Sequence, residues 1–346
     1  MYPGMRRLTA AVLLLAAPPA FPCSAFLQDG PSGPVVGKSY DWSDERGLAI
    51  VNKRGMAKRA LVLSAADEPA TWRSRFASLT LNQYGRELPN GGMNEAGLVV
   101  EVLVLAATET EPPDGRPVVT ELDLVQYLLD QAETTPEAVS LARTVRVVTA
   151  YAPLHYFVCD AADACAVLEL IDGRLVVSTG ADLPVRAVTN SAYAESVGAL
   201  GRGAGDRSSL GRFATVAGQL RTPPRTRRGG PVPAALAILD SVRSPSFTKW
   251  NVVYEPAARR VHFRTRNHPA LKTVSLDRFA PGCVEPAQVL DLASGATGDV
   301  TGQFVPYRPE TNRALVEATL TPLRGALPPG IVQRVAEHPA SSACDP

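Results

Sequence analysis

One cysteine near the start of the chain, Cys23, has the residue type and position best suited to chemistry. It follows a segment typical of a secretion leader, so removal of residues 1–22 would make Cys23 the first residue of the mature protein. A free α-amine has a pKa of about 7.7 and a thiol one of about 8.5, so the two exchange a proton at little cost near neutral pH. The amine can therefore act as the base for its own thiol, and the thiolate can attack an amide carbonyl.

The carboxylate of Asp41 is expected beside that cysteine. Two predicted strands, Ser24–Gln28 and Pro34–Asp41, flank a turn of Asp, Gly, Pro and Ser residues and form a hairpin. Its register places Cys23 opposite the end of the second strand, with Lys38 one diagonal away. Asp41 could then bind the amine or orient the thiol. Negative charge that develops on the attacked carbonyl would need hydrogen-bond donors nearby.

The four histidines offer an alternative base but no metal site. None has ligand spacing with the cysteines, so we expect no metal and no cofactor. His155, between two apolar residues of a predicted strand, could serve as the base in a cysteine–histidine pair with Cys23. A hydrogen-bonded core histidine is the simpler interpretation of the same position.

The other four cysteines suggest disulfides, which an exported chain can form. Cys159 and Cys165 lie at the two ends of a short connection between predicted strands, so they could bridge a hairpin. Cys283 and Cys344 would then fix the C-terminal tail. Four cysteines allow three pairings, and the sequence alone does not choose among them. We expect these two pairs with Cys23 left free, a free buried cysteine without a function being the alternative for Cys23.

Residues 1–22 have the layout of a signal peptide. Two arginines precede an apolar run of about ten residues, half the roughly 20 residues that a bilayer span needs. A proline directly before Cys23 is unfavourable for a signal peptidase, so cleavage after Ala20 and later loss of two residues is a second route. A lipoprotein and a buried N-terminal helix fit the pattern less well. We expect a periplasmic or secreted protein without a membrane span.

The rest of the chain indicates one layered domain. A formal charge of +1 over 346 residues gives no sign of a nucleic-acid partner. No linker or repeat divides residues 23–346, which are expected to form a single domain, with a homo-oligomer left open. Blocks of strands alternate with pairs of helices, which favours layered α+β over a Rossmann-type series. The further predicted strands are 48–53, 60–63, 77–83, 98–105, 154–159, 165–171, 174–178, 185–190, 250–254, 260–265 and 272–276, the predicted helices are 121–132, 137–144, 209–220 and 232–242, and residues 91–97 are predicted as a turn.

Five short motifs together resemble a known family. In chain order they are Cys23, Gly-Lys-Ser-Tyr-Asp-Trp at 37–42, Gly-Met-Asn-Glu-Ala-Gly-Leu at 92–98, Val-Thr-Asn at 188–190 and Leu-Gly-Arg-Phe at 210–213. With the leader ending at the cysteine, they resemble the choloylglycine hydrolase and penicillin V acylase family of linear amide C–N hydrolases, which are N-terminal nucleophile hydrolases. The resemblance extends from Cys23 to about residue 279. It implies a four-layer αββα sandwich.

The resemblance also implies a role for each matched residue. Cys23 would be the nucleophile and, through its amine, the base, and Asp41 would hold that amine and thiol. The Asn190 side-chain amide and the backbone N–H of Val104 would form the oxyanion hole. Arg212 would steady the cluster. Simpler interpretations are a strand-end cap for Asp41, a turn residue for Asn190 and a surface helix arginine for Arg212.

Lys38 departs from the family pattern, because bile-salt hydrolases usually carry arginine at this place. A lysine presents one compact charge where an arginine presents a planar fork, so the two are not equivalent near a carboxylate. We expect a supporting role for Lys38, and the departure weighs against bile-salt specificity more than against amide hydrolysis. The expected function is an exported amidase that cleaves a linear N-acyl amide of a small molecule through a cysteine thioester. The alternatives are an acyltransferase that uses the same acyl-enzyme and a non-catalytic secreted binding protein.

Overall fold

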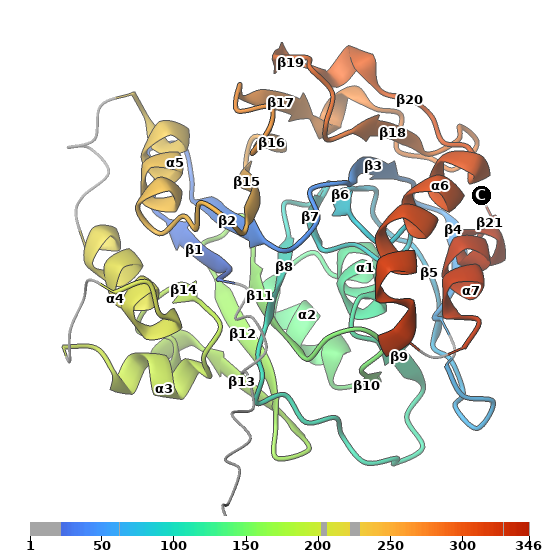
Figure 1. Cartoon of the computed structure of the whole chain (residues 1–346), viewed down its shortest axis with the longest axis horizontal. Helices are drawn as coiled ribbons and strands as arrows, with labels where there is room; N and C mark the ends of the chain where they lie inside the picture. Colours follow the sequence, from blue (N-terminus) through green and yellow to red (C-terminus); the bar gives the residue numbers. More distant parts are fainter. Residues whose placement is uncertain (1–21, 62, 202–205, 222–228, 328, 346) are drawn as a thin grey trace, which may run out of the picture.

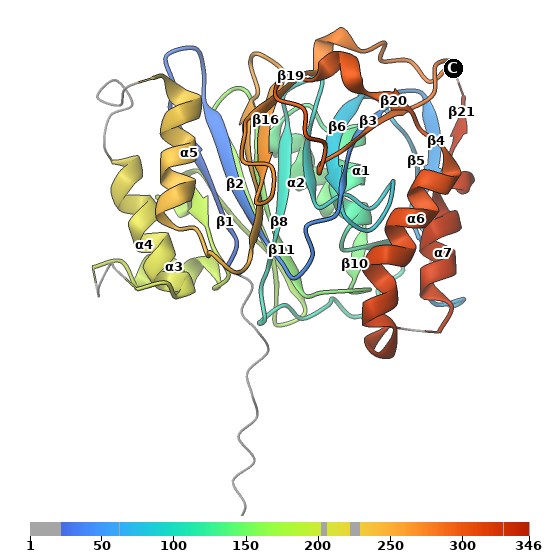
Figure 2. The ribbon, with the colours of Figure 1, turned by 45° about the horizontal axis from the view of Figure 1, so that its top comes forward.

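Two β-sheets face each other at the centre of the molecule (Figures 1 and 2). The structure, a computed structural model, describes residues 22–61, 63–201, 206–221, 229–327 and 329–345, so the predicted leader lies outside it except for Pro22. The first sheet has the order β14 (Ala187–Val188), β1 (Ser24–Gln28), β2 (Val35–Asp41), β15 (Thr248–Glu255), β16 (Arg260–Thr265), β17 (Lys272–Ser275) and β19 (Gly298–Asp299). The second sheet has the order β13 (Arg174–Thr179), β12 (Cys165–Ile171), β11 (Leu154–Cys159), β8 (Val99–Val104), β7 (Gly91–Asn94), β6 (Ser78–Asn82), β3 (Leu48–Asn52), β18 (Gln288–Asp291) and β20 (Val305–Pro306).

Helices cover the outer face of each sheet. On the first sheet, α4 (Ser209–Leu220) packs on β1 and β14, and α5 (Pro231–Ser241) packs on β2 and β15. On the second sheet, α1 (Asp123–Gln131) packs on β7 and β8, and α2 (Thr135–Ala142) packs on β11 and β12. The result is the αββα sandwich that the resemblance implied.

Shorter elements complete the chain. The helix α3 (Tyr193–Gly198) precedes α4, and two C-terminal helices, α6 (Pro309–Leu320) and α7 (Ile331–Glu337), stand beside the second sheet (Figure 2). Two small sheets pair β9 (Val118–Thr120) with β10 (Arg146–Val148), and β21 (Ala343–Cys344) with β4 (Met56–Arg59) and β5 (Thr71–Arg73). The 3₁₀ helices are η1 (Gly180–Asp182), η3 (Leu276–Arg278), η4 (Thr301–Gln303), η5 (Thr321–Ala326) and η6 (His338–Ser341).

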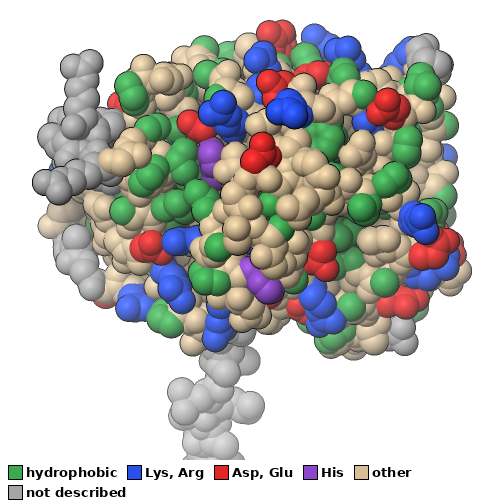
Figure 3. All heavy atoms as spheres, turned by 90° about the horizontal axis from the view of Figure 1, so that it is seen from above, with side chains coloured by type: hydrophobic (Ala, Val, Ile, Leu, Met, Phe, Trp, Pro, Cys, Tyr) green, Lys and Arg blue, Asp and Glu red, His purple; other side chains and the backbone are tan. Residues whose placement is uncertain are grey.

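Alternation along the strands sorts side chains into two cores. On β8, Val99 and Leu103 face the first sheet, whereas Val100 and Val102 belong to the cluster under α1 and α2. This two-residue period is what a strand between two apolar layers requires. On the face shown in Figure 3, basic and acidic side chains are interspersed, with no patch of one sign. No helix in the described part of the chain is long and apolar enough to cross a bilayer.

Most predicted elements are confirmed, and three predictions need correction. Of the strand predicted over 60–63, residue 62 lies outside the described residues and the other three are not in a strand, because the Leu61 N–H bonds the carboxylate of Asp123 at 3.1 Å instead of a neighbouring strand. The predicted turn begins as strand β7, where Gly91 has no side chain and leaves room for the carboxylate of Glu101. The strand predicted over 185–190 is limited to β14. The division into a leader and a single domain stays a prediction.

The cysteines pair as expected. Cys159 bonds Cys165 across the β11–β12 hairpin, and Cys283 bonds Cys344, 61 residues further along the chain. Cys23 is free and buried. The Cys283–Cys344 disulfide closes a long loop that contains both C-terminal helices, α6 and α7.

The two disulfides should differ in their effect on stability. In the chain-entropy picture, a cross-link that closes a longer loop removes more freedom from the unfolded chain. Replacing Cys283 and Cys344 by alanine should lower the free energy of unfolding by about 4 kcal/mol, and replacing Cys159 and Cys165 by about 2 kcal/mol. Urea unfolding of both double variants measures this order. A larger loss from the shorter loop would contradict it.

Candidate active site

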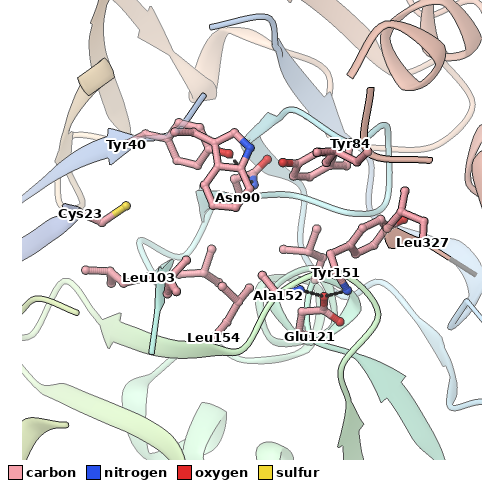
Figure 4. A pocket seen from close by; sticks show the side chains of 15 residues that line it. Cys23, Tyr40, Tyr84, Asn90, Leu103, Glu121, Tyr151, Ala152, Leu154 and Leu327 are labelled. Atoms are coloured by element: carbon pink, nitrogen blue, oxygen red, sulfur yellow. Dashed lines mark hydrogen bonds between the residues drawn. The ribbon is translucent and has the colours of Figure 1, made fainter. Parts of the chain in front are cut away.

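Cys23 lies at the edge of an apolar pocket, directly before β1 (Figure 4). The β1–β2 register pairs Ser24 with Ser39, so Cys23 comes opposite the end of β2, as the hairpin predicted. The backbone N–H of Asp41 donates to Cys23 Sγ at 3.4 Å, and the Asp41 carbonyl lies 3.7 Å from the same sulfur. The hairpin itself therefore fixes the thiol.

The carboxylate of Asp41 is completely buried and held by two hydroxyls. Ser39 Oγ donates to it at 2.7 Å and accepts the Ser24 N–H at 3.1 Å. Thr248 Oγ1 also donates to it, from a point where an irregularity in the β2–β15 ladder shifts the register. Burial raises the pKa of Asp41, and the two hydroxyls act in the opposite direction. Asp41 is therefore tied to both neighbouring strands and is not a strand-end cap.

Arg212 reaches Cys23 from α4, whose N-terminus is capped by the side chain of Ser208. Its Nη1 donates to the carbonyls of Pro22, at 2.6 Å, and Cys23, and to Ser24 Oγ at 2.8 Å. Its Nη2 donates to Asn190 Oδ1 at 2.8 Å. Arg212 is 4% exposed, and burial lowers its pKa. It is a buried residue of the cluster and not a surface arginine.

Asn190 and Val104 lie together on one side of β8. The Asn190 side-chain amide donates to the Val104 carbonyl at 2.9 Å. The Leu105 N–H donates to the Pro153 carbonyl, so these two residues form a hydrogen-bonded pair of the antiparallel β8–β11 ladder. Hydrogen-bonded and non-hydrogen-bonded pairs alternate along such a ladder, so the next pair, Val104 and Leu154, is not hydrogen-bonded. The N–H of Val104 then points away from β11, to the side where Asn190 lies. An asparagine amide has a second hydrogen to donate. That these two groups bind an oxyanion stays a prediction.

Lys38 lies between the sheets in contact with Glu101, a residue that the sequence reading passed over. Its Nζ donates to the Val102 carbonyl and lies 3.8 Å from Glu101 Oε2. The hydroxyl of Tyr254 donates to the other oxygen of Glu101. Burial raises the pKa of Glu101 to about 7, although Lys38 and Tyr254 favour its charged form. A single acidic residue in an apolar strand was the sequence signal for this buried pair.

His155 is not available as a base for the thiol. Its Nδ1 is 3.0 Å from Glu169 Oε1 and its Nε2 is 2.7 Å from the Thr189 carbonyl. Both ring nitrogens are therefore engaged, and the bond to Thr189 fixes the residue before Asn190. The structure gives no support to a cysteine–histidine pair.

The surroundings of Cys23 favour the protonated form of its thiol. Burial raises its pKa, and the charge of Asp41 acts in the same direction. The positive charges of Lys38 and Arg212 and the N–H of Asp41 lower the pKa by less. A base is therefore needed to form the thiolate. In the described part of the chain no group of His, Cys, Asp or Glu side chains is arranged to hold a metal ion.

The pocket beside Cys23 is lined mainly by apolar and aromatic side chains. Tyr40, which lines the pocket, stacks on Trp250 with the ring centroids 4.0 Å apart. Its lining includes Tyr40, Trp42, Tyr84, Asn90, Val102, Leu103, Val104, Glu121, Leu122, Tyr151, Ala152, Leu154, Leu323 and Leu327. Such a pocket suits an apolar group attached to the carbonyl that the thiol would attack.

Glu101 should make stability depend on pH. Its pKa is raised from 4.5 to about 7, so the folded protein binds this proton more tightly than the unfolded chain does. The contribution of Glu101 therefore lowers the free energy of unfolding as pH rises from about 4.5 to about 7, by at most about 3 kcal/mol. Glu101→Gln should remove this part of the slope in urea unfolding measured across that range. The exposed Glu133→Gln is the control, and equal slopes for wild type and Glu101→Gln would contradict the assignment.

The chain is similar to amide hydrolases in sequence and in fold. Residues 33–197 match the family described as linear amide C–N hydrolases, choloylglycine hydrolase family. The chain is 23% identical to penicillin V acylase from Pectobacterium atrosepticum, over 87% of this chain and 95% of that one. The matched family region contains Lys38, Asp41, Val104 and Asn190, whereas Cys23 and Arg212 lie outside it.

Solved structures show the same fold. Penicillin V acylase from Agrobacterium tumefaciens superposes with a TM-score of 0.73 at 21% identity, covering 83% of this chain and 98% of the other. A variant of conjugated bile acid hydrolase from Clostridium perfringens superposes with a TM-score of 0.66 at 14% identity, covering 80% and 98%. Over residues 33–197 the chain is thus similar to the choloylglycine hydrolase family of linear amide C–N hydrolases, and it shares the fold of the solved amide hydrolases.

Proposed function

We propose that the mature protein begins at Cys23, is exported, and hydrolyses the linear amide of an N-acyl small molecule through a thioester on Cys23. One observation supports this most directly. The only free cysteine of the described residues lies against an apolar pocket, with a thiol that needs a base and no histidine to provide it. The leader pattern and the two disulfides favour the periplasm or the exterior.

In the proposed reaction the freed α-amine of Cys23 takes the proton of the thiol. The thiolate attacks the amide carbonyl, and a bond between sulfur and carbon forms. The negative charge on oxygen is stabilised by the Asn190 amide and the Val104 N–H. The carbon–nitrogen bond then breaks, and the leaving nitrogen takes the proton from the α-amine. Water, deprotonated by the same amine, then attacks the thioester carbonyl, and the carbon–sulfur bond breaks. The acid is released and the Cys23 thiolate takes the proton back from the amine.

Asp41 and Arg212 keep the reacting groups in position. The backbone of Asp41 holds the sulfur, and its carboxylate lies close enough to the first residue for its charge to act on the thiol. Arg212 binds the Cys23 carbonyl and the Asn190 amide oxygen at the same time. The nucleophile and the oxyanion donor are thereby linked through one side chain.

The acyl group of the substrate is proposed to be apolar or aromatic. The four aromatic residues of the pocket and the penicillin V acylase relatives favour penicillin V over conjugated bile acids as the nearer substrate type. Lysine at position 38 fits this preference. Assays of the purified protein with penicillin V, bile-acid conjugates and acyl-homoserine lactones would identify the class.

A residue left in front of Cys23 should abolish activity. The preceding peptide bond would turn the α-amine into an amide that cannot accept a proton, while Arg212 still binds the Pro22 carbonyl, so the protein should fold. Hydrolysis by this extended form is compared with that of the form starting at Cys23, both verified by intact mass. The Cys23→Ser variant should be inactive in either form. Full activity with the bond before Cys23 intact would rule out the amine as base.

Asn190→Ala should slow the chemical step. Loss of one oxyanion donor typically lowers kcat by roughly 100-fold or more, with little change in KM. Steady-state kinetics with the best substrate measure this split, and the exposed Asn267→Ala is the matched control. An Asn190→Ala variant that changes KM alone would contradict the proposed role.

A further inference from the structure

One wall of the pocket is a loop that is held by a buried carboxylate. Figure 4 shows Tyr151, Ala152 and Leu154 on the side of the pocket that also carries Glu121. Glu121 lies in the turn between β9 and α1, and it is 1% exposed. The sequence reading placed it at the start of a helix and gave it no role.

Glu121 binds three successive backbone N–H groups. Oε2 accepts from Ala150 at 2.6 Å, and Oε1 accepts from Tyr151 at 2.5 Å and from Ala152 at 3.1 Å. Both carboxylate oxygens are therefore occupied by the backbone. Three of the roughly four acceptor positions of this carboxylate are thus taken by the loop backbone.

Regular backbone bonds hold the two ends of this loop. On one side the Glu121 N–H donates to the Val148 carbonyl at 3.1 Å, and on the other the Leu105 N–H donates to the Pro153 carbonyl at 2.9 Å. Between these points the loop is joined to the body of the molecule by the Glu121 carboxylate. The ring of Tyr151 then stacks on that of Tyr84, with centroids 5.5 Å apart and planes at 13°.

A carboxylate in this place is costly. Burial raises the pKa of Glu121 to about 7, although three N–H donors favour the charged form. A neutral amide would avoid that cost, but its NH₂ group would face an N–H donor and only its single oxygen could accept. A carboxylate is therefore better suited than an amide to accept hydrogen bonds from three N–H groups at once.

We propose that Glu121 is a positioning residue for the acyl pocket, holding segment 150–152 and the Tyr151 ring as the wall on which the far part of an acyl group packs. The inference rests on the proposed function. Cys23 and Asn190 act at the carbonyl, whereas Glu121 acts only on the part of the acyl group that reaches the wall. The KM for substrates with short acyl groups should therefore not depend on Glu121.

The test is Glu121→Gln assayed with N-acyl anilides from acetyl to octanoyl. Loss of the Ala150 bond should raise KM for the octanoyl substrate by about tenfold, with KM for the acetyl substrate and both kcat values nearly unchanged. Glu95→Gln is the matched control, because Glu95 accepts the Ala77 N–H at 2.9 Å and does not line the pocket. Equal changes for both substrates, or no change, would overturn the proposal.

A second measurement does not depend on catalysis. Hydrogen exchange of the wild-type protein should find the amides of residues 150–152 protected, and Glu121→Gln should exchange the Ala150 amide faster. Unprotected amides in the wild type, or unchanged exchange in a folded variant, would overturn the positioning role. If the variant does not fold, the wild-type exchange alone decides. A protein that hydrolyses neither penicillin V nor any other N-acyl amide tested, but shows this exchange pattern, would refute the proposed function and leave the hold of Glu121 on segment 150–152 in place.

Discussion

The guanidinium of Arg212 is the interaction on which the arrangement of the site depends. From the outer helical layer it passes the first sheet and binds the carbonyls before and after the Cys23 nitrogen, and the side chains of Ser24 and Asn190. A buried cation is unfavourable unless its donors are bound, and burial does lower the pKa of this arginine. Its oxygen partners must therefore stay in place, so Cys23 and Asn190 are held in position together.

The charges around Cys23 come from different layers of the sandwich. Lys38 lies between the sheets and is compensated by Glu101, whereas Asp41 is held by hydroxyls within the first sheet. Arg212 comes from outside. The positive charges lower the pKa of the thiol, but its burial has the larger effect. The positive side chains thus offset part of the rise in the thiol pKa but do not reverse it. This agrees with a base that is formed only when the residues before Cys23 are removed.

Local signals made the hairpin, most strands of the two large sheets and the four helices that cover them predictable, because turn residues and apolar periods act over short distances. The helices α3, α6 and α7 were not predicted. Asp41 followed from the hairpin register, whereas Asn190 and Arg212 were identified through a family resemblance. Glu101 and Glu121 were missed. Their partners are a lysine on the facing sheet and a loop about 30 residues further along the chain, and no local pattern shows which buried carboxylate meets which donors.

These two carboxylates share a pKa raised to about 7 by burial, yet they have opposite surroundings. Glu101 faces a cation whose charge reaches the thiol, so its ionisation is tied to the electrostatics of Cys23. Glu121 faces only neutral N–H groups, so its ionisation is tied to the shape of the pocket. Replacing both by well-packed apolar residues would remove two desolvation costs. That the fold retains them beside Cys23 and its pocket is what the proposed function requires, because stability can be given up where charge and shape must be held for a substrate.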